Sequence, residues 1–382
     1  MKGSRLFLTL AAPLLAIVFA LVASTLALIL SGNSVGDVFQ VMVDQVTSMR
    51  EIVKTLNRAG PYYVSGVAVA IGFKMNLFNI GVEGQYRLGG VVAAAAGAAL
   101  PLPGPLRLLG VLAVAMLVGA AWAGIAGVLR AYRGVSEVIA TIMLNAIALG
   151  LTPFLLTRYF VEEKEVGSID YAIRTDPIPK GGRLPVLDFL GNHDGARLNA
   201  FIFLAAVVGV VYWILIWRSR FGFDLRASGA NPHAARASGV NAKRMTVVAM
   251  LISGGIAGLV GLSTILGSPY SYTEESFLSG LGFTGIAIAL LGRNNPVGIA
   301  LGALLWAFID VARTPLAGAE LPREITTIVQ GIIVLSVVVA YEVVQRLGQR
   351  WEAAAIARQI DEPEPPPESP PSTEPTPAGV GA

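Results

Sequence analysis

The sequence has no cysteine and only two histidines, His193 and His233, in 382 residues. The missing thiols exclude disulfide bonds, thiolate catalysis and cysteine-ligated metals. The two histidines lie far apart in the chain and do not form a pattern typical of a metal site. The sequence therefore predicts neither a metal site nor a bound cofactor.

Charge is also scarce. Charged residues make up 14% of the chain and hydrophobic residues 54%, against about 25% and 45–50% in soluble domains. Several apolar runs reach about 18 residues or more, the length of a helix that crosses a bilayer. Basic residues in such chains mainly set orientation, so the net charge of +3 does not indicate nucleic acid. We predict an all-α polytopic protein of the cell (inner or plasma) membrane.

The apolar runs predict about ten transmembrane helices. The run from Leu6 to Leu30 is longer than the apolar core of a signal peptide, so we expect a retained first span. Basic residues are dense in 129–134 and 218–244, which we place inside, together with both termini. The predicted spans are 7–30, 61–79, 86–101, 107–129, 137–156, 199–217, 245–267, 277–292, 296–312 and 325–344.

The chain divides into a membrane domain and a tail. Residues 1–345 form the predicted transmembrane domain, 346–360 a cytoplasmic helical extension, and 361–382 a disordered segment rich in proline and glutamate. Within the domain, residues 31–60 carry apolar side chains at helical spacing, which indicates an amphipathic surface helix. Residues 157–197 are predicted to form an extracellular loop.

The stretch FNIGVEGQ (78–85) places polar residues and glycines between two apolar runs. One interpretation is a helix break that lines the transport pathway, with Asn79, Glu83 and Gln85 offering hydrogen bonds to a polar solute. The other is a cytoplasmic turn in which Glu83 is solvated near Arg87. A carboxylate in a membrane span is costly. The predicted spans place a connection here, which favours the turn, whereas the family resemblance described below favours the break.

Glu137, Thr141 and Asn145 are spaced to share one face of a predicted helix. A polar stripe within a span faces the interior of the bundle, where it lines a cavity or bonds a neighbouring helix. We count Thr141 and Asn145 as candidate pathway residues with both roles open. Glu137 is either near the cytoplasmic mouth of the pathway or a helix-start residue.

The segment 218–244 is polar, basic and contains its own short helix. Asn231 is a good N-cap, Pro232 suits the first helical position, and Gly239 stands where a left-handed stop belongs. Two interpretations remain open from these residues alone: an ordinary surface loop, or a rigid docking element with Gly229, Ala234 and Ala235 on or beside the helix.

No catalytic constellation is present. The sequence contains no HExxH motif, and no Gly-Lys pair from which a GxxxxGK[ST] phosphate loop could be built. The chain is therefore predicted not to be an enzyme, and any ATP that drives it must bind another polypeptide. An ion-coupled carrier that uses Glu83 and Glu137 is a less favoured alternative, since a lone carrier has no use for a docking helix.

Four stretches resemble one family in the same order. GFDLRASGANPHAARASGVN (222–241), GVSEVIATIMLNAIA (134–148), GFTGIAIALLGRNNPVGIALGALLWA (282–307) and FNIGVEGQ are similar to ABC permeases of the branched-chain amino acid, ribose and nucleoside importer superfamily. The last is typical of its nucleoside and simple-sugar branch. The resemblance spans about residues 60–345, and the N-terminal extension and the tail depart from it.

The resemblance implies a permease subunit that moves nucleosides, or alternatively simple sugars or branched-chain amino acids, by alternating access. It implies three partners: an ABC ATPase subunit, a second permease of similar fold, and an extracellular or periplasmic substrate-binding protein. It also implies that the short helix after Gly229 and Asn231 couples the chain to the ATPase. Nucleic acid is not among the expected partners.

Overall fold

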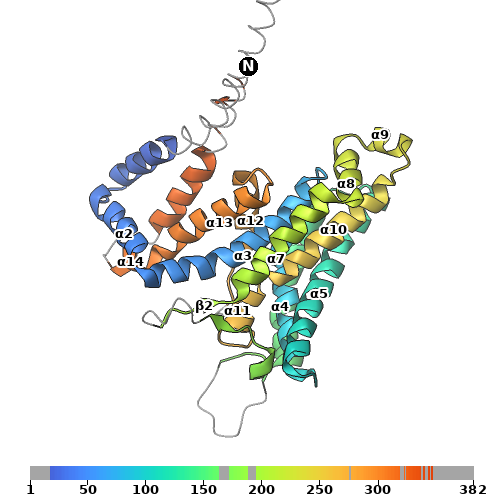
Figure 1. Ribbon diagram of the computed structural model, residues 1–382, viewed down its shortest axis with the longest axis horizontal. Coiled ribbons are helices and arrows are strands. Elements are labelled where there is room, and N and C mark those ends of the chain that lie inside the picture. Colours follow the sequence, from blue (N-terminus) through green and yellow to red (C-terminus); the bar gives the residue numbers. More distant parts are fainter. Residues whose placement is uncertain are drawn as a thin grey trace, which may run out of the picture. The chain divides into compact units, whose positions relative to one another are not determined.

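The computed structural model describes residues 18–162, 172–187, 195–274, 277–318, 322, 324–336, 339, 343, 344 and 346. The predicted tail 361–382, and all of the predicted extension 346–360 except its first residue, lie outside the described residues. The chain forms two compact units, of which Ala20–Leu335 is the larger; Met1–Phe19 and Ser336–Ala382 make up the other. The larger unit is a bundle of helices (Figure 1).

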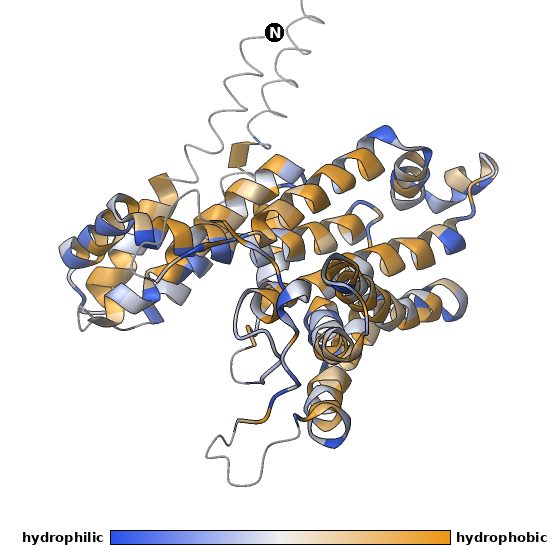
Figure 2. Ribbon diagram, turned by 60° about the horizontal axis from the view of Figure 1, so that its bottom comes forward, coloured by the Kyte–Doolittle hydropathy of each residue, from blue (hydrophilic) through white to orange (hydrophobic). Residues whose placement is uncertain are grey.

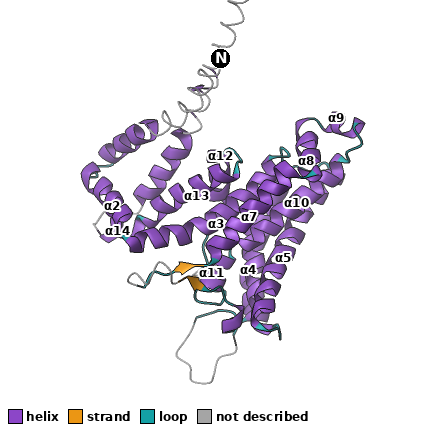
Figure 3. Ribbon diagram, in the orientation of Figure 1, coloured by secondary structure: helices purple, strands orange, loops and turns teal. Residues whose placement is uncertain are grey.

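The described residues are mostly helical with very little sheet, as predicted (Figure 3). Leu156–Phe160 and Ile214–Arg218 extend α6 and α7 as π-helices, Lys180–Gly182 is a 3-10 turn, and β1 (Val186–Leu187) pairs antiparallel with β2 (Leu198–Asn199). Helices α2 to α7 are Val35–Thr47, Met49–Phe73, Val82–Ala99, Gly104–Arg133, Glu137–Leu155 and Phe201–Trp213. Helices α8 to α14 are Arg220–Ala230, Pro232–Ala237, Ala242–Leu259, Leu262–Gly267, Leu281–Leu291, Pro296–Val311 and Arg313–Gly318.

Five segments are long and apolar enough to cross a membrane: Gly104–Arg133, Glu137–Phe160, Phe201–Arg218, Ala242–Gly267 and Pro296–Ala317. Each covers a predicted span. Shorter apolar helices, Val18–Leu30, Leu281–Leu291 and Glu324–Ser336, cover parts of three more. Hydrophobic residues run along the long helices, and hydrophilic ones gather at their ends and connections (Figure 2). The protein is a multi-pass membrane protein, and the number and direction of the crossings stay predictions.

The predicted surface helix over 31–60 is wrong in its extent. The structure divides the segment at Ser48, which follows α2 and precedes α3. Helix α3 then continues into the predicted span 61–79 and ends at Phe73, so the helix begins 12 residues before that span and ends six residues before its predicted end. The start of α3 was missed because its charged residues face a cavity, described below, rather than lipid.

Glycines allow α5 and α10 to pack backbone against backbone. Cβ atoms added at Gly119 or Gly254 would each overlap backbone atoms of the other glycine, and one at Gly258 would overlap the Ala115 carbonyl. Small residues at helix contacts permit this close approach. In a membrane the hydrophobic effect does not drive helices together, so their association depends on such packing. The packing of α10 on α5 holds the central part of the bundle together.

Candidate substrate and coupling sites

A helix break separates α3 from α4. Helix α3 ends at Phe73 and α4 begins at Val82, so the first half of FNIGVEGQ is not helical and the second half is the first turn of α4. Asn79 is 1% exposed and Glu83 is 6% exposed. These values exclude a solvated Glu83 and show a buried helix break; that the break lines the transport pathway stays a prediction.

Asn79 ties the break to the neighbouring helices. Its side-chain amide and that of Gln85 exchange two hydrogen bonds, with N to O distances of 3.0 and 2.9 Å. Asn79 Nδ2 also donates to Ser253 Oγ on α10 at 2.8 Å, and the Ser253 hydroxyl donates to the Ala68 carbonyl on α3 at 2.6 Å. Because buried amides need partners, this network sets one conformation for the break.

Glu83 lies where the N-termini of α4 and α12 meet. Its carboxylate accepts hydrogen bonds from the backbone N–H groups of Gly280, at 3.0 Å, and Gly282, at 3.1 Å. Arg87 Nε donates to Glu83 Oε1 at 3.0 Å, and Arg87 Nη1 donates to Glu274 at 2.8 Å. A negative charge is favourable at a helix N-terminus, and here two helices supply that field. The carboxylate is thus bound by the protein itself.

Tyr86 connects Glu83 to the segment before α12. Its hydroxyl lies 2.6 Å from Glu83 Oε1 and 2.8 Å from the carbonyl oxygen of Leu278. The ring is fully buried and stacks on Phe277, with ring centroids 5.5 Å apart. Glu83 and Tyr86 therefore join the break to residues 277–282.

The polar stripe on α6 faces the same break. Thr141 is fully buried, and Asn145 is 7% exposed. Asn145 Nδ2 donates to the Ile80 carbonyl at 2.8 Å, and its Oδ1 accepts from the N–H of Gly84 at 2.9 Å. The Thr141 hydroxyl donates to the Glu137 carbonyl of its own helix at 2.7 Å. Of the two roles considered for the stripe, Asn145 in this conformation bonds the neighbouring segment rather than lining a cavity.

Asn79, Glu83, Gln85, Thr141 and Asn145 thus form one buried group around the break, although the sequence spreads them over two segments. Their hydrogen bonds are to groups of the chain itself, and the large cavity described below is lined by other residues. Glu137 lies beside the group and pairs with Arg130 Nε at 3.1 Å, as a helix-start residue does.

The predicted capped helix is present as α9. Asn231 Oδ1 accepts from the N–H groups of His233 and Ala234 at 3.0 and 3.1 Å, and Pro232 is the first helical residue. Gly239 has φ +84°, the left-handed conformation expected of a helix stop. The caps fix both ends of a helix that is too short to be stable on its own.

Helix α9 is exposed except at Ala235, which is 4% exposed. The sequence analysis did not distinguish α8, which precedes it and begins at Arg220. Gly229 of α8 lies against the backbone of Met75, directly after α3, at a separation that leaves no room for a Cβ atom. Helix α8 is therefore packed against the end of α3, α9 follows it, and α10 begins at Ala242 after a short connection (Figure 1).

Lys74 follows α3 at this end of the unit. Its ammonium lies 5.0 Å from the centroid of the Trp217 ring. Burial, and then the positive charge of Arg226, lower the pKa of Lys74. The sequence analysis placed this lysine inside a span, whereas the structure ends the helix one residue before it.

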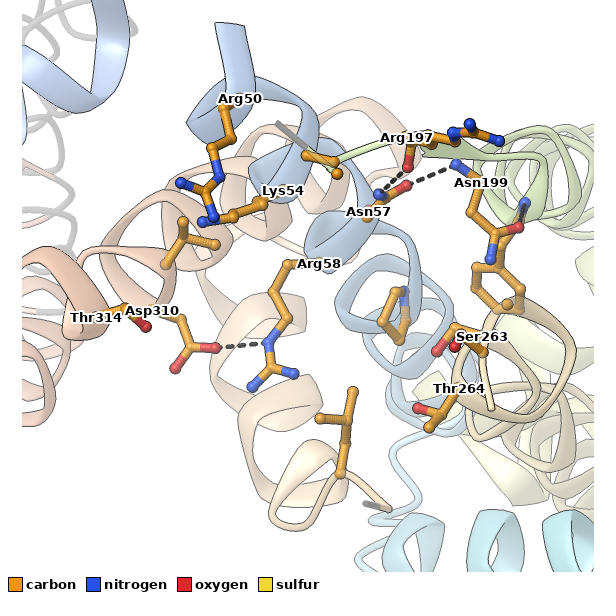
Figure 4. Close-up of a pocket in the computed structure, with 18 of the residues that line it drawn as sticks. Arg50, Lys54, Asn57, Arg58, Arg197, Asn199, Ser263, Thr264, Asp310 and Thr314 are labelled. Atoms are coloured by element: carbon orange, nitrogen blue, oxygen red, sulfur yellow. Dashed lines mark hydrogen bonds and ion pairs between the residues drawn. The ribbon is translucent and has the colours of Figure 1, made fainter. Parts of the chain in front are cut away.

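A cavity of about 1210 Å³ lies toward the other end of α3 and α10, which we call the Arg58 cavity. Arg50, Lys54 and Arg58 from the start of α3 line it, together with Ser263 and Thr264 of α11 (Figure 4). The charged lining residues are the cations Arg50, Lys54, Arg58, Arg197 and Arg313 and the acids Asp310 and Glu324.

Asp310 organises one wall of the Arg58 cavity. Its Oδ2 accepts from Arg58 Nε at 2.6 Å and from the Tyr62 hydroxyl at 3.0 Å, and its Oδ1 lies 3.2 Å from Arg313 Nε. The sequence analysis missed this cluster. The signal was available, since Asp310 is a lone carboxylate inside the predicted span 296–312, and such residues are functional candidates by default.

The Arg58 cavity and the break are connected through one loop. Leu278 lines the cavity, and its carbonyl oxygen is the group 2.8 Å from the Tyr86 hydroxyl. Gly280, two residues further, donates to Glu83. Hydrogen bonds thus link a residue that lines the cavity to the first turn of α4.

The sequence matches the family described as "branched-chain amino acid transport system / permease component" over residues 51–338. It is 35% identical over 336 residues to the guanosine ABC transporter permease protein NupP of Bacillus subtilis, covering 87% of this chain and 93% of that protein. It is 30% identical over 331 residues to the nucleoside ABC transporter permease protein NupB of Lactococcus lactis, covering 86% and 90%.

A glucose ABC transporter permease protein of Haloferax volcanii is 30% identical over 336 residues, covering 85% of each chain. These relatives are named as permease subunits rather than as enzymes.

Proposed function

The chain belongs to the family of branched-chain amino acid transport system permease components, and from that premise we propose that it imports nucleosides as the membrane-spanning subunit of an ABC transporter. Two relatives that match it over most of both chains are named as guanosine and nucleoside permeases, which supports this substrate class. The glucose permease among the relatives makes simple sugars the second candidate.

The observation that carries the mechanism is α9, a capped and exposed helix that follows α8, which itself packs against the end of α3. We propose that it docks on a separate ATPase subunit, because the chain has no phosphate loop of its own. The end with α8 and α9 then faces the cytoplasm, and the Arg58 cavity faces outward.

In this orientation the Arg58 cavity receives the solute from a substrate-binding protein outside. A second permease of similar fold would complete the pathway, and apolar side chains such as Leu117 and Leu301, 69% and 64% exposed, are available for lipid or for that subunit. Both termini are expected in the cytoplasm.

We propose that the buried group around the α3–α4 break belongs to the substrate pathway. Asn79, Glu83 and Gln85 set the break, and Asn145, on the helix that also carries Thr141, holds it to α6. The group lies between Leu278, which lines the Arg58 cavity, and the end of the unit that carries α8 and α9. Alternating access needs an element at this place that can adopt two conformations, one open to each side of the membrane. Rearrangement of these hydrogen bonds would open the route inward.

The test is uptake of labelled guanosine by cells that carry the whole gene cluster, compared with a strain that lacks this chain. We expect uptake to be lost without the chain, restored by its expression, and abolished when the partner ATPase cannot hydrolyse ATP. Competition with excess unlabelled glucose should have no effect. The proposal would be contradicted if the chain supported uptake of glucose rather than guanosine. It would also be contradicted if a protonophore stopped guanosine uptake while the ATP concentration stayed high.

A further inference from the structure

Arg58 is an anchored cation that points into the cavity. Its Nε donates to Asp310 at 2.6 Å, and Asp310 is buried, with a side chain 5% exposed. The Arg58 side chain itself is 28% exposed. Figure 4 shows Nε on the side of Asp310 and the two terminal nitrogens at the far end of the Arg58 side chain, among the residues that line the cavity. Asp310 therefore takes up the Nε donor, and the guanidinium carbon also lies 5.5 Å from the centroid of the Tyr62 ring. The two terminal nitrogens are the donors that a ligand in the cavity would meet.

The edge that Arg58 presents has a specific chemistry. A guanidinium offers only donors, in a rigid planar arrangement that fits two neighbouring acceptor atoms. The cavity wall carries five cationic and two acidic side chains, so it favours the acceptor edge of a polar solute. Among nucleosides, guanine presents two neighbouring acceptors, O6 and N7, and arginine binds them as a pair.

The rest of the cavity suits a sugar. The Thr264 and Thr327 side chains and the Asn199 amide line the same space, and hydroxyls and amides pair with ribose hydroxyls. The volume exceeds that of an ordinary small-molecule pocket, about 300–1,000 Å³, so a nucleoside fits with water around it.

We infer that Arg58, positioned by Asp310, binds the O6 and N7 edge of a 6-oxopurine nucleoside in this cavity before the solute passes inward. The inference rests on the proposed function and adds to it the base that is preferred and the residue that recognises it. Adenine has an amino group beside N7, so the adenine amino donor would face an N–H donor of Arg58 and no hydrogen bond could form there.

The experiment compares uptake of guanosine with that of 7-deazaguanosine, which lacks the N7 acceptor. The variants are wild type, Arg58→Lys, Arg58→Gln and, as a matched control, Arg174→Lys. Arg174 is similar to Arg58, since its Nε pairs with Glu162 at 2.6 Å, but it does not line the cavity. The preference of the substrate-binding protein is the same in all variants and cancels when the guanosine to 7-deazaguanosine ratios are compared.

We expect the wild-type preference for guanosine to fall by about three- to tenfold in Arg58→Lys, which keeps the charge and the Asp310 pair but loses the planar edge. Arg58→Gln should lower it at least as much, and Arg174→Lys should leave it within about twofold. An equal loss of uptake for both nucleosides, or an unchanged ratio, overturns the inference while the proposed function stands. Absence of any nucleoside uptake by the wild type overturns both.

Discussion

Arg58 and Asp310 are 252 positions apart in the sequence, yet Arg58 Nε lies 2.6 Å from Asp310 Oδ2. The pair joins α3 to α13, and Arg313 at the start of α14 completes it from the other side of the carboxylate. A charge that is buried and bonded in this way sets the position of every group that it contacts. One carboxylate thus determines the geometry of a cavity wall built from three helices.

Asp310→Asn should lower both stability and transport. The amide leaves the positive charges of Arg58 and Arg313 without compensation, and breaking a buried pair costs about 3–5 kcal/mol. Because Arg58 is partly exposed, we expect roughly 1–3 kcal/mol, measured by thermal unfolding of the purified complex. Asp37→Asn on α2, an exposed carboxylate, is the control and should behave as wild type. Equal stabilities of the two variants would contradict the organising role of Asp310.

Glu83→Gln should weaken uptake by roughly several-fold to thirtyfold, because hydrogen bonds to a charged acceptor contribute about 1.5–3 kcal/mol and neutral ones about 1. The substitution also removes the charge that two helix N-termini and Arg87 surround. Glu83→Ala should do worse, since it leaves buried donors unpaired. The measurement is nucleoside uptake normalised to protein in the membrane.

The control for Glu83 is Glu162→Gln, which removes a carboxylate from an ion pair outside the break. It should change uptake by less than about twofold, as surface substitutions usually do. Wild-type uptake in both Glu83 variants would mean that the break does not depend on this charge.

Glutamates at Ala234 and Ala237 should uncouple ATP hydrolysis from uptake. Both positions are exposed on α9, so the membrane fold should survive, whereas Ala235 is buried and unsuitable. New negative charges on a docking surface weaken binding, because the partner surface offers them no complementary positive charge. Co-purification of the ATPase and its activity are measured beside uptake. Serine at the same two positions is the control, and normal uptake in a correctly assembled double glutamate variant would refute docking through α9.

Gly258→Ala should reduce the amount of folded protein, because a Cβ atom there overlaps the Ala115 carbonyl of α5. Overpacking of this kind costs about 1–3 kcal/mol or more when the neighbour is backbone that cannot move aside. Gly255→Ala on the same helix is the matched control, since its Cβ would lie 3.5 Å from the nearest atom, the Met116 carbonyl oxygen. Fluorescence-detected gel filtration of both variants distinguishes them, and equal yields would count against close packing of α5 on α10.

Removal of the segment after Ile360 should have little effect. The segment is acidic and proline-rich and offers no apolar face to bury. A stop codon after Ile360 is expected to leave expression and uptake within about twofold. Complete loss of assembly would identify the segment as a partner-binding element.

The sequence alone determined the membrane class, because the length and apolarity of a spanning helix are local properties of a segment. It also determined α9, since the caps Asn231 and Gly239 act on their own neighbours in the chain. FNIGVEGQ showed in the same way that a helix is interrupted near Gly81, because glycine and asparagine weaken the interior of a helix.

Only the tertiary structure decided what surrounds these elements. Glu83 is buried rather than solvated because α12, almost 200 residues later in the sequence, brings the N–H groups of Gly280 and Gly282 to it. Asp310 meets Arg58 for the same reason, since the packing of α13 against α3 depends on side chains along both helices. Local patterns specify helices and caps, but the partner of a buried charge depends on which helices pack together, and no single segment contains that information.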